Sequence, residues 1–176
     1  MKAIFAFALL AASGPAAAEV VTSSPNGFEV RESVQLVVPP DQAWDAFEQV
    51  GSWWNPAHTY SGKAANMRMA LSLGACLCET FEETGGGIEH LRVVYADPGK
   101  RAILTGSLGP LLYEATSGVM DLTVERIAAG SRVTMNYRVS GFYKGGADKL
   151  APGVDAVLAD QLKRYRVYAT ARPHSR

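Results

Sequence analysis

Polar and apolar residues alternate in several segments of the chain, which is the pattern of half-buried β-strands. In the segment 132–140, Val133, Met135, Tyr137 and Val139 fall on one side and polar residues on the other. The segment 118–127 alternates in the same way, and a short turn joins the two into a hairpin. We predict strands at 29–38, 67–72, 75–83, 88–96, 101–106, 118–127 and 132–140, and the short turns between most of them predict antiparallel pairing.

Two segments change from the strand period to a helical one. Residues 40–50 start at a proline suited to the first turn of a helix and carry Trp44, Phe47 and Val50 at helical spacing. Apolar residues between Val154 and Ala169 recur at three and four, which predicts a long helix of about 17 residues. We therefore expect an α+β fold, in which an antiparallel sheet of about six to seven strands curves around the long C-terminal helix, with two short helices after the first strand.

The first 18 residues have the three features of a secretory signal peptide. Lys2 gives a positive start, an apolar run extends to Ala12, and small residues at 16–18 suit cleavage after Ala18. The apolar run is roughly half of the ~20 residues that a membrane-spanning helix needs. We expect a periplasmic or secreted protein without stable membrane anchoring. Its parts would be a cleaved signal peptide (1–18), a flexible N-terminal arm (19–27), a single domain (28–170) and a disordered tail (171–176).

Composition and charge narrow the range of partners. The chain has 17 Lys and Arg against 17 Asp and Glu, so we expect no nucleic-acid partner, because such surfaces are basic. It has no nucleophile elbow, no phosphate-binding glycine loop and no H-E-x-x-H motif. The residues thus give no positive sign of an enzyme, and we expect no cofactor.

Three segments carry a family resemblance in their order and spacing. They are VPPDQAWDAFEQVGSWWNP (38–56), HLRVVYADPGKRAILTG (90–106) and GVDAVLADQLKRYRVYA (153–169). With the opening strand, they resemble the START-related helix-grip (SRPBCC) superfamily, including its polyketide-cyclase-like and co-chaperone-activator-like branches, over about residues 28–170. The resemblance implies a small hydrophobic molecule held in a cavity between the sheet and the long helix. We expect an exported binding or carrier domain; the alternative is a cyclase- or lyase-type enzyme acting on a polyketide-like or aromatic substrate.

Aromatic residues in the irregular segment after the first helix are the leading candidates for a ligand site. Trp53, Trp54, His58 and Tyr60 combine apolar bodies with polar tips, which suits a pocket wall that also orients its ligand. The alternative is that at least one tryptophan fills the core beneath the helix. Four more residues are candidates for the lining, although residues of this kind more often belong to a core. They are Tyr113, Met120, Met135 and Tyr137.

His90 and Arg92 in the strand 88–96 have two interpretations. Leu91, Val93 and Tyr95 occupy the more apolar side of this strand, which favours an outward, solvated position for His90 and Arg92. Alternatively, both point into the cavity and bind a ligand carboxylate or carbonyl, with Glu79 or Glu89 as their counter-charge. In the enzyme alternative, His58 or His90 would act as the general acid or base.

Cys76 and Cys78 point to the same side of a predicted strand. Residues two apart in a regular strand are about 6.6 Å apart, near the upper limit for the Cα atoms of a disulfide. We therefore expect two packed cysteines by default. A strained redox-active disulfide is one alternative, and a metal site formed with His90 is another. We expect no metal, because the C-x-C spacing is not that of structural zinc sites and no second pair completes the set of ligands.

Overall fold

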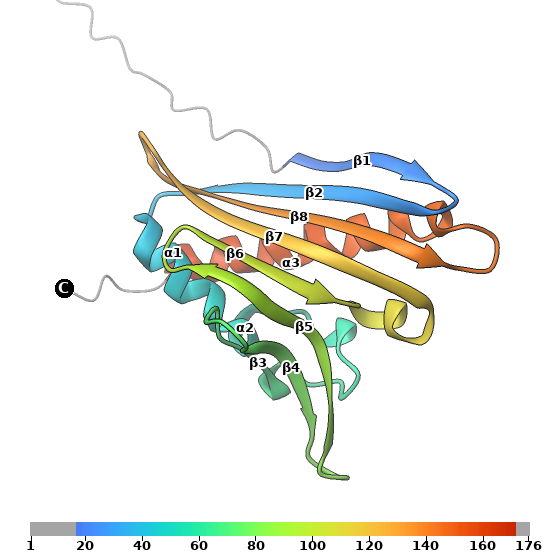
Figure 1. Cartoon of the computed structure of the whole chain (residues 1–176). Helices are drawn as coiled ribbons and strands as arrows, with labels where there is room; N and C mark the ends of the chain where they lie inside the picture. The colour runs from blue at the N-terminus through green and yellow to red at the C-terminus, as the bar shows by residue number, and fades with distance from the viewer. Residues whose placement is uncertain (1–16, 172–176) are drawn as a thin grey trace, which may run out of the picture.

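The computed structural model describes residues 17–171. Its main feature is one eight-stranded sheet with the strand order β1-β2-β8-β7-β6-β5-β4-β3 (Figure 1). Every neighbouring pair is antiparallel. The strands are β1 (Ala17–Ser24), β2 (Gly27–Leu36), β3 (Met67–Met69), β4 (Cys76–Phe81), β5 (Gly86–Asp97), β6 (Arg101–Gly106), β7 (Ala115–Ile127) and β8 (Gly130–Phe142).

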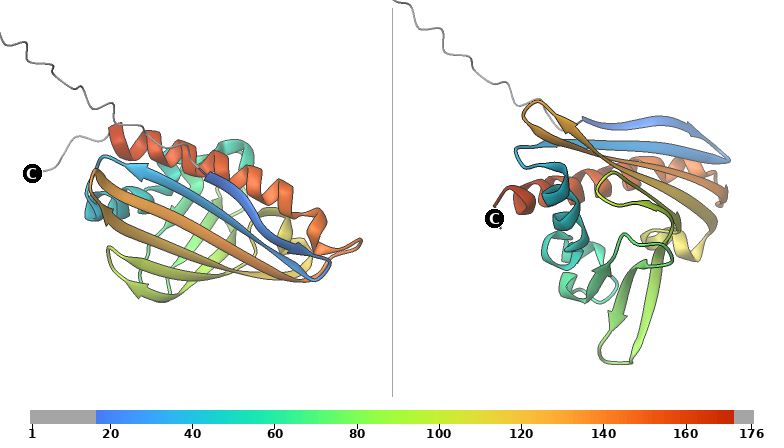
Figure 2. Two further views of the ribbon diagram at one scale, coloured as in Figure 1. Left: turned by 90° about the horizontal axis from the view of Figure 1, so that it is seen from above. Right: turned by 60° about the vertical axis from the view of Figure 1, so that its left-hand side comes forward.

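A long C-terminal helix, α3 (Ala151–Ala171), lies along one face of the curved sheet (Figure 2). The two short helices after β2 are α1 (Pro40–Glu48) and α2 (Val50–Trp53). The connections also contain the 3-10 turns η1 (Pro56–His58), η2 (Ala64–Asn66), η3 (Gly109–Tyr113) and η4 (Ala147–Lys149). The expected α+β arrangement is confirmed, with eight strands in place of six to seven.

The additional strand is β1, which lies where we expected a flexible arm over 19–27. It pairs with β2 from Ala17↔Ser33 to Ser24↔Gly27. The Ser24 hydroxyl donates a hydrogen bond to the Gly27 carbonyl (3.1 Å), and Val20 packs against the core. The turn residues that suggested a loose arm instead close a hairpin. Most of the expected signal peptide, residues 1–16, and all but the first residue of the expected tail, residues 172–176, lie outside the described residues.

The core fills the space between the sheet and the middle of α3. Phe47, Trp53 and Tyr165 form an aromatic cluster with ring centroids 5.0 to 5.4 Å apart. The Trp53 indole donates a hydrogen bond to the Ala46 carbonyl (3.1 Å). The void left beside this cluster has a volume of only about 30 Å³, which is room for about one water molecule.

Two irregularities in β5 decide which way its side chains point. Opposite the register shift between Leu77 and Cys78 of β4, His90 and Leu91 are consecutive but both buried. At the second shift, between Val93 and Tyr95, Tyr95 is exposed while Val93 is buried. Bulges of this kind break the simple alternation of a strand. The prediction that Tyr95 shares a face with Leu91 and Val93 is therefore wrong.

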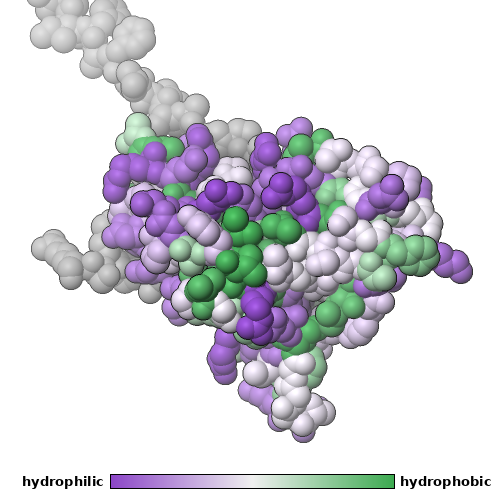
Figure 3. All heavy atoms as spheres, viewed as in Figure 1, coloured by the Kyte–Doolittle hydropathy of each residue, from purple (hydrophilic) through white to green (hydrophobic). Residues whose placement is uncertain are grey.

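The outer face of the sheet is turned away from α3. Figure 3 shows this face with hydrophilic side chains over much of its upper part and hydrophobic ones gathered toward its middle. Within residues 17–171, no helix combines the length and the apolar character needed to cross a membrane.

Candidate ligand-binding site

A cavity of about 480 Å³ lies at the N-terminal end of α3. Its volume is within the range of small-molecule pockets, roughly 300 to 1,000 Å³. Four parts of the chain form its walls: the segment 54–60, His90 of β5, the segment 108–113 around η3, and the segment 150–158 at the start of α3. The residues that line it are Trp54, Ala57, His58, Thr59, Tyr60, His90, Leu108, Gly109, Pro110, Leu111, Tyr113, Leu150, Gly153, Val154, Val157 and Leu158.

Side chains of α3 hold the irregular segment 54–60 in place. Gln161 is fully buried, and its Oε1 accepts a hydrogen bond from the Asn55 backbone N–H (2.8 Å). Its Nε2 donates to Nδ1 of His58 (2.8 Å). The Asn55 side chain donates to Asp160 (2.7 Å), and the Trp54 indole donates to the His58 carbonyl (2.9 Å). This wall of the cavity is therefore fixed to the helix, although it has little regular structure of its own.

Glu79 of β4 is a buried carboxylate next to the same segment. It accepts hydrogen bonds from the backbone N–H groups of Tyr60 (3.0 Å) and Ser61, and its Oε2 lies 3.3 Å from Nε2 of His90. Burial would raise the pKa of Glu79, but the hydrogen bonds from Ser61, Tyr60 and His90 together lower it below its ordinary value. Glu79 is therefore ionised at neutral pH.

His90 lines the cavity with only 3% of its surface exposed. Burial lowers the pKa of His90 because it removes water from the charged imidazolium, and the nearby Glu79 opposes this only in part. The ring is therefore neutral at pH 7. Its Nδ1 is buried and has no hydrogen-bond partner among the residues that the structure describes.

Two tyrosines lie at the edge of the cavity. The Tyr60 hydroxyl donates a hydrogen bond to the Gly109 carbonyl (2.7 Å), which links the segment 54–60 to η3. The Tyr60 ring lies 5.9 Å from the His90 ring and 5.8 Å from the Tyr113 ring, between centroids. Burial and the neighbouring Tyr113 raise the pKa of Tyr60 to about 12, so its hydroxyl stays protonated.

The structure brings five of the candidate residues together at this cavity: Trp54, His58, Tyr60, His90 and Tyr113. The others lie elsewhere. Trp53 belongs to the aromatic core, as the alternative interpretation held. Met120 and Met135 line the small inner void. Tyr137 is buried, and its hydroxyl donates to the Gly106 carbonyl (3.1 Å) and accepts from the Leu108 backbone (3.2 Å), so it supports the loop that leads to η3.

The favoured outward position of His90 is wrong, whereas Arg92 does lie on the outer face. The bulge in the β4–β5 ladder turns His90 inward, where Glu79 is its partner. Arg92 remains exposed and pairs with Glu89 (Nε to Oε1, 2.9 Å). Sequence reasoning missed Gln161, and the signal for it was a polar residue within the apolar stripe of the C-terminal helix.

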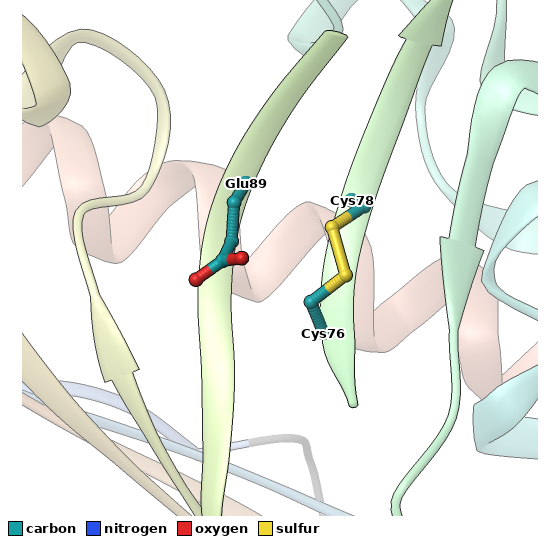
Figure 4. Close-up of side chains that lie close together, drawn as sticks. All are labelled: Cys76, Cys78 and Glu89. Carbon is teal, nitrogen blue, oxygen red and sulfur yellow. A yellow bond between two sulfur atoms is a disulfide. The ribbon is translucent and has the colours of Figure 1, made fainter. Parts of the chain in front are cut away.

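Cys76 and Cys78 form a disulfide bond (Figure 4), so the default expectation of two packed thiols is wrong. Their Cα atoms are 5.5 Å apart, closer than the about 6.6 Å of a regular strand. Glu89 lies beside them, with the possible ligand atoms of all three residues within 4.8 Å of one another. Metal binding needs thiolates, which the disulfide removes. His90 does not join this group, so the alternative of a metal site with His90 is not supported.

No protein-family model matches the chain, and no curated protein matches it. Solved structures do. Protein MLL2253 from Mesorhizobium loti superposes with a TM-score of 0.59 at 18% identity, over 83% of this chain and 99% of its own. Ara h 8.0201 gives 0.57 at 15% identity, over 83% and 99%. DynU16, from the dynemicin biosynthetic locus, gives 0.55 at 19% identity, over 81% of this chain and 47% of its own.

The chain has a helix-grip fold. The sheet that curves around a long C-terminal helix and the similarity to these structures agree on this point. At such low identity the similarity establishes the fold alone, and a fold does not determine a function.

Proposed function

We propose that this helix-grip domain binds a small hydrophobic molecule in the cavity at the N-terminal end of α3. The cavity itself carries the proposal, because it holds about 480 Å³ behind a mainly apolar and aromatic lining. His58, Tyr60 and His90 add polar side chains to this lining. Such a combination is typical of sites that bind apolar ligands in one orientation. The resemblance to START-related proteins, which hold hydrophobic molecules, supports the same conclusion.

The proposed site lies at one end of the helix and not beneath its middle. The volume of about 30 Å³ between the sheet and the centre of α3 is too small for an organic ligand. Trp53, Met120 and Met135 fill that region as core residues. A ligand is therefore expected to contact the segments 54–60 and 108–113 together with the first turns of α3.

The test is a fluorescence titration with N-phenyl-1-naphthylamine, a neutral dye that brightens in apolar pockets. Gly153 lines the cavity, and a Cβ atom added there meets no atom within 4 Å. Gly153→Phe should therefore place a ring in or across the cavity without a backbone clash, and phenylalanine is a better helix former than glycine. We expect this variant to bind the dye at least about tenfold more weakly, a loss of about 1.4 kcal/mol.

Ala156→Phe is the matched control, because it adds the same ring to the exposed side of the same helix. We expect the control to bind like the original chain. Failure of the original chain to bind the dye, or equal binding by both variants, would contradict a ligand site in this cavity. Circular dichroism of each variant shows whether α3 is intact.

We also propose that the chain is exported. The support is the signal-peptide pattern of residues 1–18, together with a disulfide between Cys76 and Cys78, which is typical of oxidising compartments. When the full chain is produced in a bacterial host, protein recovered from the periplasm should have the intact mass of residues 19–176. Recovery of the uncleaved chain from the cytoplasm alone would contradict export.

A further inference from the structure

The disulfide between Cys76 and Cys78 lies on the outer face of the sheet, away from the ligand cavity. Leu77 and Glu79 alternate with the two cysteines along β4, and both are buried on the inner face. The cysteines are half-buried on the other face, where the residues opposite them on β3 and β5 are exposed. Figure 4 shows the disulfide on the side of β4 that is turned away from α3. A thiol in solution can therefore approach it.

This disulfide contributes little to holding the fold together. It joins residues only two apart in the sequence. A disulfide stabilises a fold mainly by restricting the unfolded chain, and this effect is smallest for the shortest loops. Backbone hydrogen bonds also hold β4 on both sides, to β3 and to β5. Opening the disulfide should therefore leave the strand in place.

Positive charge surrounds the two sulfur atoms. Arg92 of β5 is paired directly opposite Cys76. Arg68 of β3 is paired in the same way with Cys78, and side chains at such positions share a face with Cβ atoms roughly 5 Å apart. The Glu89 carboxylate also lies beside the sulfurs, but both of its oxygens pair with Arg92. Two arginines against one glutamate leave a net positive charge, which stabilises a thiolate.

We propose that Cys76 and Cys78 form a thiol–disulfide exchange site that oxidises accessible dithiols, such as cysteine pairs of other polypeptides. A thiolate of the dithiol attacks one sulfur, forms a mixed disulfide and releases the other cysteine as a thiolate opposite its arginine. The second thiol of the substrate loses its proton to water and attacks the mixed disulfide, which releases the first cysteine. The substrate thus loses two electrons and two protons and becomes a disulfide, while the chain becomes a dithiol. Oxidised glutathione restores the chain by the reverse exchange.

The first test asks whether the folded chain exchanges its disulfide with glutathione. The chain is incubated in reduced and oxidised glutathione at the ratio of the cytosolic pool, its thiols are blocked with iodoacetamide, and the intact mass counts the blocked cysteines. Structural disulfides of secreted proteins resist reduction under these conditions. We expect both cysteines to be blocked in most molecules, with the circular dichroism of the oxidised fold unchanged. A chain that stays oxidised, or that unfolds when it is reduced, would overturn the proposal.

The second test measures how fast dithiothreitol, a dithiol that closes to a ring when oxidised, opens the disulfide. Arg68→Gln removes the positive charge opposite Cys78, so we expect opening to slow at least about threefold because the leaving thiolate is less stable. Arg138→Gln is the matched control, since Arg138 is an exposed arginine on β8, a strand that is not next to β4. Its rate should equal that of the original chain. Equal rates in all three chains would overturn the inference that these arginines favour exchange.

The oxidising activity itself is measured with a synthetic peptide that carries two cysteines. We expect the original chain to convert an equal amount of the peptide to its disulfide form, followed by mass spectrometry. Cys78→Ser cannot form the disulfide and should convert none. It should still bind N-phenyl-1-naphthylamine, because the exchange site and the cavity are separate. Absence of peptide oxidation by the original chain would overturn the proposed exchange activity and leave the proposed ligand site intact.

Discussion

Glu32 and Asp155 form a carboxyl pair between β2 and α3 that opposes stability at neutral and higher pH. Glu32 is 1% exposed. Burial, a hydrogen bond with Asp155 and the charge of Asp155 together raise the pKa of Glu32 to about 8. Oε1 of Glu32 and Oδ1 of Asp155 are buried without partners among the described residues. The folded protein therefore keeps a proton on Glu32 at pH 7, where an unfolded chain has lost it.

We predict that Glu32→Gln stabilises the protein at pH 7 to 8. Because folding raises the Glu32 pKa, this carboxyl does not lower the stability of the fold below about pH 4.5, where it is protonated in both states. As pH rises toward 8, the folded protein keeps a proton that the unfolded chain has lost, and the stability falls. Glutamine stays neutral and can still donate to Asp155. At 1.36 kcal/mol per pKa unit, the gain at pH 7 is at most about 3 kcal/mol. Urea unfolding at pH 4.5, 7 and 8 measures it, with Glu29→Gln on the other face of β2 as the control. A gain equal at all three pH values would contradict the prediction.

The strands and the long helix could be predicted because their burial pattern is regular. The strand over Arg101–Gly106 is observed with the expected bounds, and the long helix differs by only a few residues at each end. The orientation of His90 could not be predicted, because one register shift in the β4–β5 ladder turns its side chain to the other face. Such a register shift is not visible in the alternation of polar and apolar residues.

In the irregular segment after α2, the sequence identified residues of the candidate site but not the contacts that hold them in place. Its aromatic composition was sufficient to identify Trp54, His58 and Tyr60 as candidate lining residues, and all three line the cavity. The contacts that hold them come from distant positions: Gln161 lies 106 residues from Asn55, and Glu79 lies 19 residues from Tyr60. A local pattern contains no information about such contacts. Sequence reasoning therefore found part of the lining but not the supports that position it.

The edge strand β1 lies next to the proposed signal-peptide cleavage site. Cleavage after Ala18 would remove the two β1 residues that pair with Ser33 and Glu32, and would leave the ladder from Glu19↔Arg31 to Ser24↔Gly27. A chain of residues 19–176 should therefore keep the whole fold. Removing all of β1 would expose the edge of β2 and the core contact of Val20.

We predict that a chain of residues 25–176 unfolds at a lower temperature than a chain of residues 19–176. Both chains retain Pro25, whose carbonyl accepts a hydrogen bond from Ala147 (2.9 Å), so the difference reports on β1 alone. At about 2–4 °C per kcal/mol for a domain of this size, the loss of one edge strand should lower Tm by roughly 5 °C. Thermal unfolding followed by circular dichroism measures the difference. Equal Tm values would mean that residues 19–24 behave as a loose arm in solution, because an edge strand that packs Val20 against the core cannot be removed without cost.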